Sequence, residues 1–238
     1  MKTLAQLKVK IFADGADLNG MLESYKDPYI KGFTTNPTLM RSSGISDYEH
    51  FARQVLERIP DRPISFEVFS DEFSEMEKQA RKIFAWGKNV YVKIPVTNTR
   101  KESSVDLIRR LVSEGIQLNV TALMTSTQAQ VISPVLGAHV HSYISIFAGR
   151  IADTGRDPMP IMKKAVEIMA EFPNQELIWA SPRELLNIFQ ADEVGCHVIT
   201  VTHEVLKKLP LVGKDLDEYS LDTVKMFYSD AQKANFKL

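Results

Sequence analysis

The chain lacks most of the features that mark specialised classes of protein. One cysteine, Cys196, is present among 238 residues, which excludes an internal disulfide and fits a reducing compartment. Every apolar run falls short of the roughly eighteen residues that a membrane-spanning helix needs. There is no block of basic residues and the net charge is −1, so the electrostatic signature of nucleic-acid binding is missing. Because the first residues also lack the apolar core of a secretory signal, we expect a cytoplasmic protein that binds neither membrane nor nucleic acid.

Glycine-rich phosphate loops are missing as well. Neither G-x-G-x-x-G nor a P-loop motif occurs, and such a loop is usual in an open, doubly wound nucleotide-binding sheet. This absence argues against that fold, which is the main competitor for a chain of alternating strands and helices.

What the chain does contain is a regular alternation of short β-branched runs and longer amphipathic segments. Eight strands and eight helices in alternation predict parallel pairing through right-handed crossovers. Closed into a ring, they form a (β/α)₈ barrel, and the length suits this α/β fold. No linker or repeat is visible, so we expect one domain over residues 1–238. The expected strands are 7–13, 29–35, 63–69, 89–95, 117–123, 139–147, 176–181 and 197–201, and the expected helices are 17–26, 46–59, 72–86, 102–114, 125–136, 158–171, 183–194 and 203–208, with a C-terminal helix at 221–236.

Polar residues cluster near the carboxyl ends of the predicted strands. A barrel carries its catalytic groups at that end, so these side chains are candidates for one shared site. Seven strands contribute to the set, which consists of Asp14, Thr34, Asn36, Glu67, Lys93, Asn119, Thr121, Ser145, Arg150, Ser181 and Arg183.

Lys93 is the most informative member, because it interrupts the apolar run "NVYVKIPV". Burying an ammonium group costs several kcal/mol unless it is paired or loses its proton. In a dry pocket the pKa of a lysine falls, and the neutral amine can attack a ketone to form a Schiff base. Asp14 or Glu67 could then move protons, while Arg150 and Arg183 are suited to hold a phosphate.

Each candidate also has an ordinary structural explanation. Lys93 could be a salt-bridge partner, and Asp14 could cap the helix that follows it. The stretch "TTNP" (34–37) could be only a turn. In "SPRELL", Ser181 could be a helix cap and Arg183 part of the first helical turn. The combination favours a catalytic site more than any single member does.

Five motifs together resemble the transaldolase family, which includes the fructose-6-phosphate aldolases. They are "GFTTNPTLM" (32–40), "VYVKIPVT" (90–97), "LNVTAL" (118–123), "YISIFAGRIAD" (143–153) and "WASPRELL" (179–186). The resemblance runs from about residue 7 to about residue 236. It implies a (β/α)₈ barrel that performs class I aldol chemistry on sugar phosphates, without a metal ion or another cofactor.

The resemblance also implies a role for each site residue. Lys93 would form the Schiff base, and Asp14 would move the proton of the substrate hydroxyl. Glu67 and Thr121 would hold a water molecule for making and hydrolysing the imine. The remaining residues would bind the substrate: Asn36, Asn119 and Ser145 at the dihydroxyacetone unit with Thr34 beside them, and Arg150, Ser181 and Arg183 at the phosphate.

Three positions bear on which reaction of the family is performed. Fructose-6-phosphate aldolases typically carry Gln at the position of Glu67 and Tyr at that of Phe147, whereas transaldolases carry Glu and Phe, with Ser at Ser145. The resemblance therefore favours transfer of a dihydroxyacetone unit from a ketose phosphate to an aldose phosphate. The alternatives are simple cleavage of fructose 6-phosphate and, in another class, a sugar-phosphate-binding barrel without turnover. Pro182, where the family often has an aromatic residue, leaves the preferred sugar phosphate open.

Two further expectations concern assembly and metals. The length and helical tail resemble the compact branch of the family, which implies a homo-oligomer, either a pentamer or a decamer. Met226, Phe227 and Phe236 could dock on a neighbouring copy or close over the chain's own barrel. His139 and His141 share a strand face, but no third ligand is near them, so we expect no metal site.

Overall fold

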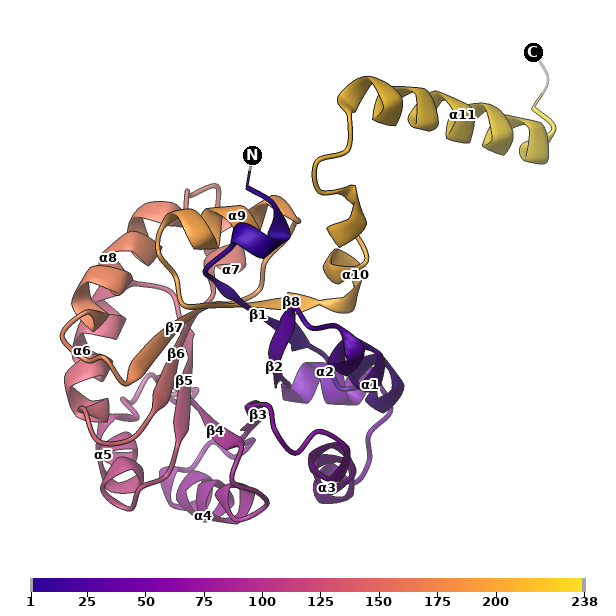
Figure 1. The fold of residues 1–238 in the computed structure, drawn as a ribbon. Coiled ribbons are helices and arrows are strands. Elements are labelled where there is room, and N and C mark those ends of the chain that lie inside the picture. The colour runs from indigo at the N-terminus through magenta and orange to yellow at the C-terminus, as the bar shows by residue number, and fades with distance from the viewer. Residues whose placement is uncertain (1, 237–238) are drawn as a thin grey trace.

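The computed structural model describes residues 2–236 and contains a closed barrel of eight parallel strands (Figure 1). The strands pair in chain order, and the last one closes the ring on the first. This architecture confirms the predicted (β/α)₈ fold. The strands are β1 (Lys10–Asp14), β2 (Ile30–Thr34), β3 (Ile64–Glu67), β4 (Val90–Pro95), β5 (Leu118–Leu123), β6 (Ser142–Ile146), β7 (Gln175–Trp179) and β8 (Val198–Thr202).

Helices surround the barrel, and one long helix leaves it. Two short helices, α2 and α7, occur where none was expected, directly after β2 and β6. The helices are α1 (Leu18–Lys26), α2 (Pro37–Ser42), α3 (Tyr48–Arg58), α4 (Phe73–Phe84), α5 (Val105–Ser113), α6 (Ser126–Leu136), α7 (Ala148–Ala152), α8 (Met159–Met169), α9 (Leu186–Glu193), α10 (His203–Leu206) and α11 (Leu216–Ala234), with 3-10 turns at Leu4–Gln6 and Leu209–Leu211.

Local sequence explains where these elements begin and end. Helix α5 buries Leu107, Ile108 and Leu111 against the strands, a spacing that places them on one helical face. Gly115, two residues beyond the helix, has φ of +79°, a conformation that favours glycine. Side-chain caps begin several helices, for example Asp47 at α3, whose carboxylate accepts from the amide of His50.

The interior of the barrel changes from apolar to polar along the strands. Side chains on a strand point inward at every second residue, so Phe12 and Tyr91 at the base are followed two residues later by polar groups nearer the carboxyl end. The base is filled by a buried cluster of Phe12, Tyr91, Tyr143, Ile178 and Val198. The polar mouth therefore rests on a packed aromatic floor, in which the Tyr91 and Tyr143 ring centroids are 4.6 Å apart.

Two expected boundaries near the site were wrong. Helix α9 begins at Leu186, not at residue 183, because Ser181 adopts φ of +60° and Pro182 disfavours helical backbone in the residue before it. Ser181 therefore does not cap the helix, and Arg183 lies in a loop. Strand β6 begins at Ser142, not at residue 139, so both His139 and His141 precede it.

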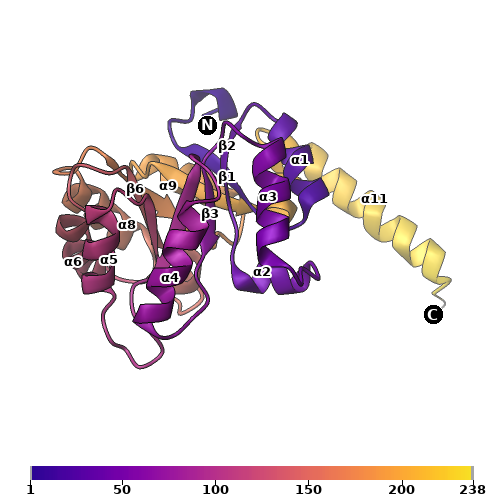
Figure 2. The same cartoon turned by 90° about the horizontal axis from the view of Figure 1, so that it is seen from below.

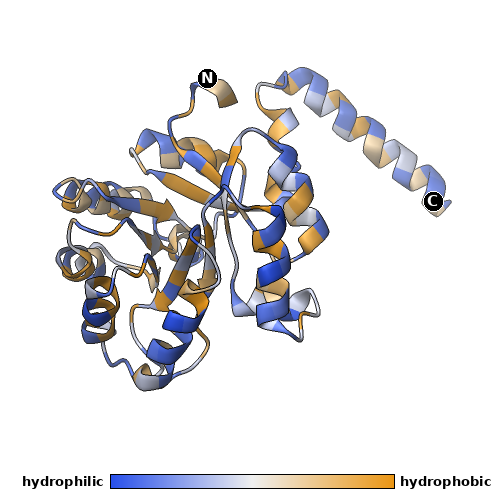
Figure 3. Ribbon diagram, turned by 60° about the horizontal axis from the view of Figure 1, so that its bottom comes forward, coloured by the Kyte–Doolittle hydropathy of each residue, from blue (hydrophilic) through white to orange (hydrophobic). Residues whose placement is uncertain are grey.

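Helix α11 projects away from the barrel, as the two perpendicular views in Figures 1 and 2 agree. It begins at Leu216, earlier than expected, because the Asp215 carboxylate accepts from the amides of Asp217 and Glu218. None of its residues is buried, so it does not close over its own barrel. In Figure 3 apolar residues recur along this helix, and Val224, Met226 and Phe227 are more than half exposed. Across residues 2–236, no helix has both the length and the apolar composition for a membrane span.

Candidate active site

Eleven of the twelve residues expected at the site lie on the carboxyl-terminal portions of the strands or in the segments that follow them, and Asn119, near the start of β5, pairs with Lys93 across the β4–β5 ladder. Asp14, Thr34 and Glu67 are the last residues of their strands. Lys93, Asn119, Thr121 and Ser145 belong to β4, β5 and β6, whereas Asn36, Phe147, Arg150, Ser181 and Arg183 follow a strand.

Lys93 is buried and paired. Its Nζ lies 2.9 Å from Oε2 of Glu67, and it donates a hydrogen bond of 2.9 Å to the backbone carbonyl of Thr35. Lys93 and Glu67 are neighbours across the ladder between β3 and β4, so the register brings them together. The sequence left open whether the buried Lys93 is paired or has lost its proton, and the structure shows that it is paired. Lys93 as a whole residue is only 5% exposed.

Asp14 is the second carboxyl group of the mouth. Its Oδ1 accepts a hydrogen bond of 2.7 Å from Oγ1 of Thr34. Burial raises the pKa of Asp14, although the charge of Lys93 and the hydrogen bond from Thr34 oppose the rise, and the charge of Glu67 adds to it. Asp14 is not a helix cap, because Asp17 begins α1 by accepting from the amide of Gly20 at 2.7 Å.

A second polar chain crosses the barrel beneath these groups. Oγ of Ser145 donates to Oδ1 of Asn119 at 2.7 Å, and Nδ2 of Asn119 donates to Oγ of Ser65 at 3.0 Å. These bonds fix the orientation of the Asn119 amide. They run from β6 through β5 to β3 and hold three buried side chains in one arrangement.

Thr121 differs from its neighbours because its buried hydroxyl group has no hydrogen-bond partner among residues 2–236. An unpaired buried hydroxyl costs free energy, and such groups in native proteins often face a bound water or substrate. The next residue, Ala122, has φ of +65° beside an irregularity in the β5–β6 ladder. Strained backbone of this kind concentrates at functional sites.

The two arginines lie on the β6 and β7 side of the mouth. Arg183 donates to both carboxylate oxygens of Asp153, with 3.0 Å from Nε to Oδ1. The guanidinium carbon of Arg150 lies 5.5 Å from the centre of the Phe147 ring. The hydrogen bond from Arg183, and also the charge of Arg150, lower the pKa of Asp153. Asp153 is therefore ion-paired with Arg183, and the charge of Arg150 also acts on it.

Gly149 allows the loop after β7 to approach α7. A Cβ atom at this position would lie 1.5 Å from the backbone carbonyl oxygen of Ser181, a distance that no side chain can occupy. Because Arg150 follows Gly149 directly and Arg183 lies two residues after Ser181, this close approach helps to set the separation of the two guanidinium groups.

Asn36 has a structural task of its own. Its side-chain oxygen accepts from the amide of Leu39 at 3.0 Å and caps α2, with Pro37 at the first helical position. The stretch "TTNP" is therefore the start of a helix, not only a turn. The amide nitrogen of Asn36 is not used in the cap and can still donate to a ligand.

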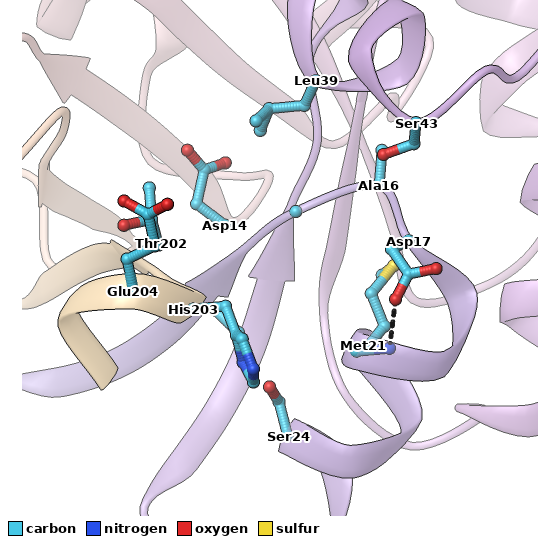
Figure 4. A pocket seen from close by; sticks show the side chains of 13 residues that line it. Asp14, Ala16, Asp17, Met21, Ser24, Leu39, Ser43, Thr202, His203 and Glu204 are labelled. Atoms are coloured by element: carbon cyan, nitrogen blue, oxygen red, sulfur yellow. Dashed lines mark hydrogen bonds between the residues drawn. The ribbon is translucent and has the colours of Figure 1, made fainter. Parts of the chain in front are cut away.

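Two pockets flank the mouth. One, of about 420 Å³, contains Asp14 and extends between α1, α2 and the start of α10, with Asp17, Ser24, Leu39, His203 and Glu204 in its wall (Figure 4). The other, of about 400 Å³, contains Glu67 together with Phe69, Pro95 and Asn98. Lys93 lines neither pocket, but its partner Glu67 lines the second one.

Sequence reasoning missed several groups of the site. They are the carbonyl group of Thr35 and the side chains of Ser65, Asp153 and Thr200. Ser65 in "ISFE" lies two residues before Glu67 on the same strand, so the period of two was the available signal there. Thr200 in "VITVT" lies on a strand that carried no candidate residue, so this signal was missing for it. Nothing in the sequence marked Asp153 as the partner of Arg183, because their contact depends on two loops meeting.

The two histidines set aside as metal ligands lie at the other end of the barrel. Nδ1 of His141 is 2.9 Å from the Tyr91 hydroxyl, its Nε2 is 3.7 Å from Glu176, and burial lowers its pKa. Within residues 2–236, no three His, Cys, Asp or Glu side chains form a group that could hold a metal ion. Cys196 is buried, which raises the pKa of its thiol to about 12.

Eight parallel strands around a polar mouth that contains a lysine–carboxylate pair place the protein among the (β/α)₈-barrel enzymes. Residues 11–238 match the family model described as Transaldolase/Fructose-6-phosphate aldolase, and the chain belongs to this family. The resemblance read from its motifs is thereby confirmed.

Relatives of known name agree with this assignment. A protein from Dehalococcoides mccartyi named probable transaldolase is 33% identical over 218 residues, which cover 90% of this chain and 97% of the relative. One from Thermoplasma volcanium with the same name is 34% identical over 204 residues, 84% of this chain and 87% of the relative.

Solved structures show similarity of fold alone. A dihydrodipicolinate synthase from Rhodopseudomonas palustris has a TM-score of 0.54 and 14% identity, and the match covers 93% of this chain and 80% of that one. The tryptophan synthase α subunit from Campylobacter jejuni has a TM-score of 0.56 and 16% identity, with 89% and 92% covered.

Proposed function

We propose that this protein is a transaldolase, which transfers a dihydroxyacetone unit from a ketose phosphate to an aldose phosphate through a Schiff base on Lys93. The observation that carries the proposal is the position of Lys93. It is buried inside the barrel, 2.9 Å from the Glu67 carboxylate. Family membership and the relatives named probable transaldolase support the same reaction.

Imine formation begins with loss of a proton from Lys93. Only a neutral amine is a nucleophile, so the proton must leave before the nitrogen can attack. Glu67 is the nearest acceptor. The amine adds to the ketone carbon, and the resulting carbinolamine loses its hydroxyl group as water. The unpaired hydroxyl of Thr121 suits that water, because it can donate or accept one hydrogen bond.

Cleavage of the carbon–carbon bond follows from the positive charge on the imine. Asp14, as a carboxylate, takes the proton of the hydroxyl group on the carbon that becomes the aldehyde. The electrons of the breaking bond move into the iminium and give an enamine on Lys93. In the second half of the reaction the enamine attacks the acceptor aldehyde, and Asp14 returns the proton. A raised pKa suits a carboxyl group that must both take and give a proton.

The remaining side chains suit the two ends of a sugar phosphate. Asn119, held by Ser145 and Ser65, offers an oriented amide to the hydroxyl groups of the dihydroxyacetone unit. Arg150 and Arg183 supply planar groups for the phosphate. Asp153 occupies only one edge of the Arg183 guanidinium, at Nε and Nη2, and leaves Nη1 for the ligand. We propose the same substrate-binding part for Thr34, Asn36, Phe147 and Ser181.

Reduction with borohydride tests the proposal. We expect that treatment in the presence of fructose 6-phosphate leaves a three-carbon adduct on the peptide that contains Lys93. The Lys93→Met variant should show no adduct and no turnover, whereas Lys31→Met, a change at an exposed lysine, should behave as the wild type. An unmodified Lys93 after borohydride treatment would reject the mechanism and leave a sugar-phosphate-binding barrel.

A separate assay distinguishes transfer from cleavage. Phe147 and Glu67 favour transfer, because a Phe ring offers no hydroxyl group to help water protonate the enamine. Free dihydroxyacetone should therefore appear slowly when no acceptor aldehyde is present. Rapid release under those conditions would identify the protein as a fructose-6-phosphate aldolase instead.

We also propose a cytoplasmic homo-oligomer, a pentamer or decamer, built on one barrel domain with α11 as its arm. The support is the apolar surface of α11, which the described part of the chain, residues 2–236, leaves exposed. Cys196, buried and unpaired, fits a reducing compartment. In analytical ultracentrifugation, the full chain should sediment as the oligomer, and a Phe227→Glu variant should dissociate toward the monomer. A monomeric full chain would overturn this part.

A further inference from the structure

Three side chains form one hydrogen-bonded row along the wall that β1, β2 and β8 share. Oγ1 of Thr200 contacts Oγ1 of Thr34, which donates to Oδ1 of Asp14 at 2.7 Å. Thr200 and Thr34 are 5% and 2% exposed, so bulk water does not compete for these bonds. The ladders account for the row: Asp14 pairs with Thr34 across β1 and β2, and β8 is the other neighbour of β1.

The number of protons fixes the direction of the row. A threonine hydroxyl has one hydrogen to donate, and that of Thr34 is used on the Asp14 carboxylate, which can only accept when it is ionised. The contact between the two threonines therefore has Thr200 as the donor and Thr34 as the acceptor. Without Thr200, the Thr34 hydroxyl would lose the partner that fixes its rotation, and it could turn away from Asp14.

We infer that Thr200 is a positioning residue for Asp14: its hydroxyl orients that of Thr34, which in turn holds Oδ1 and leaves Oδ2 for the substrate hydroxyl. The catalytic meaning of this inference rests on the proposed function, since it takes Asp14 as the group that moves the proton. The hydrogen-bond row itself does not depend on the reaction.

Other charged groups also face Asp14 and must be separated from the effect of Thr200. Lys93 on β4 and Glu67 on β3 act on it across the mouth. Asp17, His203 and Glu204 line the same pocket as Asp14 on the outer side. None of these groups changes in a Thr200 variant, so a shift in the titration of Asp14 reports the row and not its surroundings.

The experiment compares Thr200→Val with Thr200→Ser, which keeps the hydroxyl. The Asp14 carboxyl is followed by carbon-13 NMR as a function of pH, and the pH dependence of kcat is measured alongside. Loss of a hydrogen bond to a carboxylate favours the protonated form. We therefore expect Thr200→Val to move the Asp14 titration and the acid limb of kcat upward by about one pH unit, and Thr200→Ser to match the wild type.

Ser142→Ala serves as a control for destabilising the barrel, because Ser142 is a buried strand hydroxyl that begins β6 at the opposite end. It should leave both pH profiles unchanged. A Thr200→Val titration identical to that of the wild type would overturn the inference. If Thr200→Val does not fold, Thr200→Ala and Thr200→Ser give the same comparison.

A double-variant cycle then tests whether Thr200 acts through Thr34. Thr34→Val alone should shift the Asp14 titration in the same direction, and adding Thr200→Val should produce no further shift. If adding Thr200→Val shifts the Asp14 titration again by the full amount, Thr200 does not act through Thr34, and its role is merely structural. Because the NMR titration needs no turnover, failure of the row is distinguishable from failure of the transaldolase proposal, which the borohydride adduct on Lys93 tests separately.

Discussion

The Nζ atom of Lys93 lies 2.9 Å from the Oε2 atom of Glu67, across the ladder that joins β3 to β4. The pair answers the question that a lysine within an apolar strand raises. The positive charge is tolerated because a carboxylate and the Thr35 carbonyl surround it. The same arrangement supplies the group that must receive the proton when the amine becomes a nucleophile.

Replacing Glu67 by Gln should separate these two tasks. Glutamine keeps the shape and can still accept a hydrogen bond, but it cannot take a proton, so we expect kcat to fall by about two to four orders of magnitude. The free energy of unfolding should fall by about 1–3 kcal/mol, because Lys93 loses its counter-charge. Rate measurements and urea unfolding test both effects, with Glu57→Gln, an exposed position on α3, as the control. A fully active Glu67→Gln variant would contradict the role of Glu67.

Replacing Asp14 by Asn should abolish turnover and yet stabilise the fold at neutral pH. The pKa of Asp14 is raised above its ordinary value of 3.8, so the folded protein binds its proton more tightly than the unfolded chain does. The contribution of Asp14 to the stability of the wild type is therefore greatest below pH 3.8. This contribution is lost as the pH rises through the pKa that Asp14 has in the folded protein. The stabilisation by Asp14→Asn should appear above that pH and vanish below it.

Melting temperatures across a pH series test this linkage. Each kcal/mol of change in the free energy of unfolding shifts the melting temperature by roughly 2–4 °C for a chain of this size. Asp17→Asn serves as the comparison, since Asp17 is the neighbouring carboxylate and caps α1. Asparagine caps a helix about as well as aspartate, so that variant should keep the stability of the wild type across the pH series. A destabilised Asp14→Asn protein would show that Asp14 is a structural group.

Replacing Thr121 by Val should remove activity at little cost in stability. The Thr121 hydroxyl is buried without a partner, and valine has nearly the same shape, so the free energy of unfolding should stay constant or rise by about 1 kcal/mol. The slow step should become imine formation or hydrolysis, with kcat reduced about a hundredfold. Thr121→Ser keeps the hydroxyl and should stay within a few-fold of the wild type. Equal activity of Thr121→Val and Thr121→Ser would show that the Thr121 hydroxyl group takes no part in the reaction.

Replacing Gly149 by Ala should disturb the phosphate end of the site. The added Cβ would lie 1.5 Å from the Ser181 carbonyl oxygen, so the loop that carries Arg183 must move. We expect a loss of about 1–3 kcal/mol in stability and a higher KM for fructose 6-phosphate, with less effect on unphosphorylated fructose. For stability, Gly15→Ala is the matched control, because a Cβ there meets nothing within 4 Å. An unchanged KM for fructose 6-phosphate in the Gly149→Ala variant would show that Gly149 does not influence phosphate binding.

The strands of the barrel were predictable because their apolar, β-branched runs are short and regularly spaced. Boundaries failed where one residue overrides the pattern, as at Ser181, whose positive φ delays α9 to Leu186. Helices α2 and α7 were missed because each has only one or two turns directly after a strand. The residues of the mouth were found from polar positions near strand ends, and their motifs then identified the family.

The sequence by itself determined the alternation of strands and helices, the polar positions at their carboxyl ends and the family, because these depend on local composition and spacing. Only the tertiary structure decided that Lys93 is paired with Glu67, that Arg183 binds Asp153, and that Thr200 reaches Asp14 through Thr34. Each of these contacts joins residues from different strands or loops. The closure and register of the barrel set which of them meet, and no local pattern encodes that.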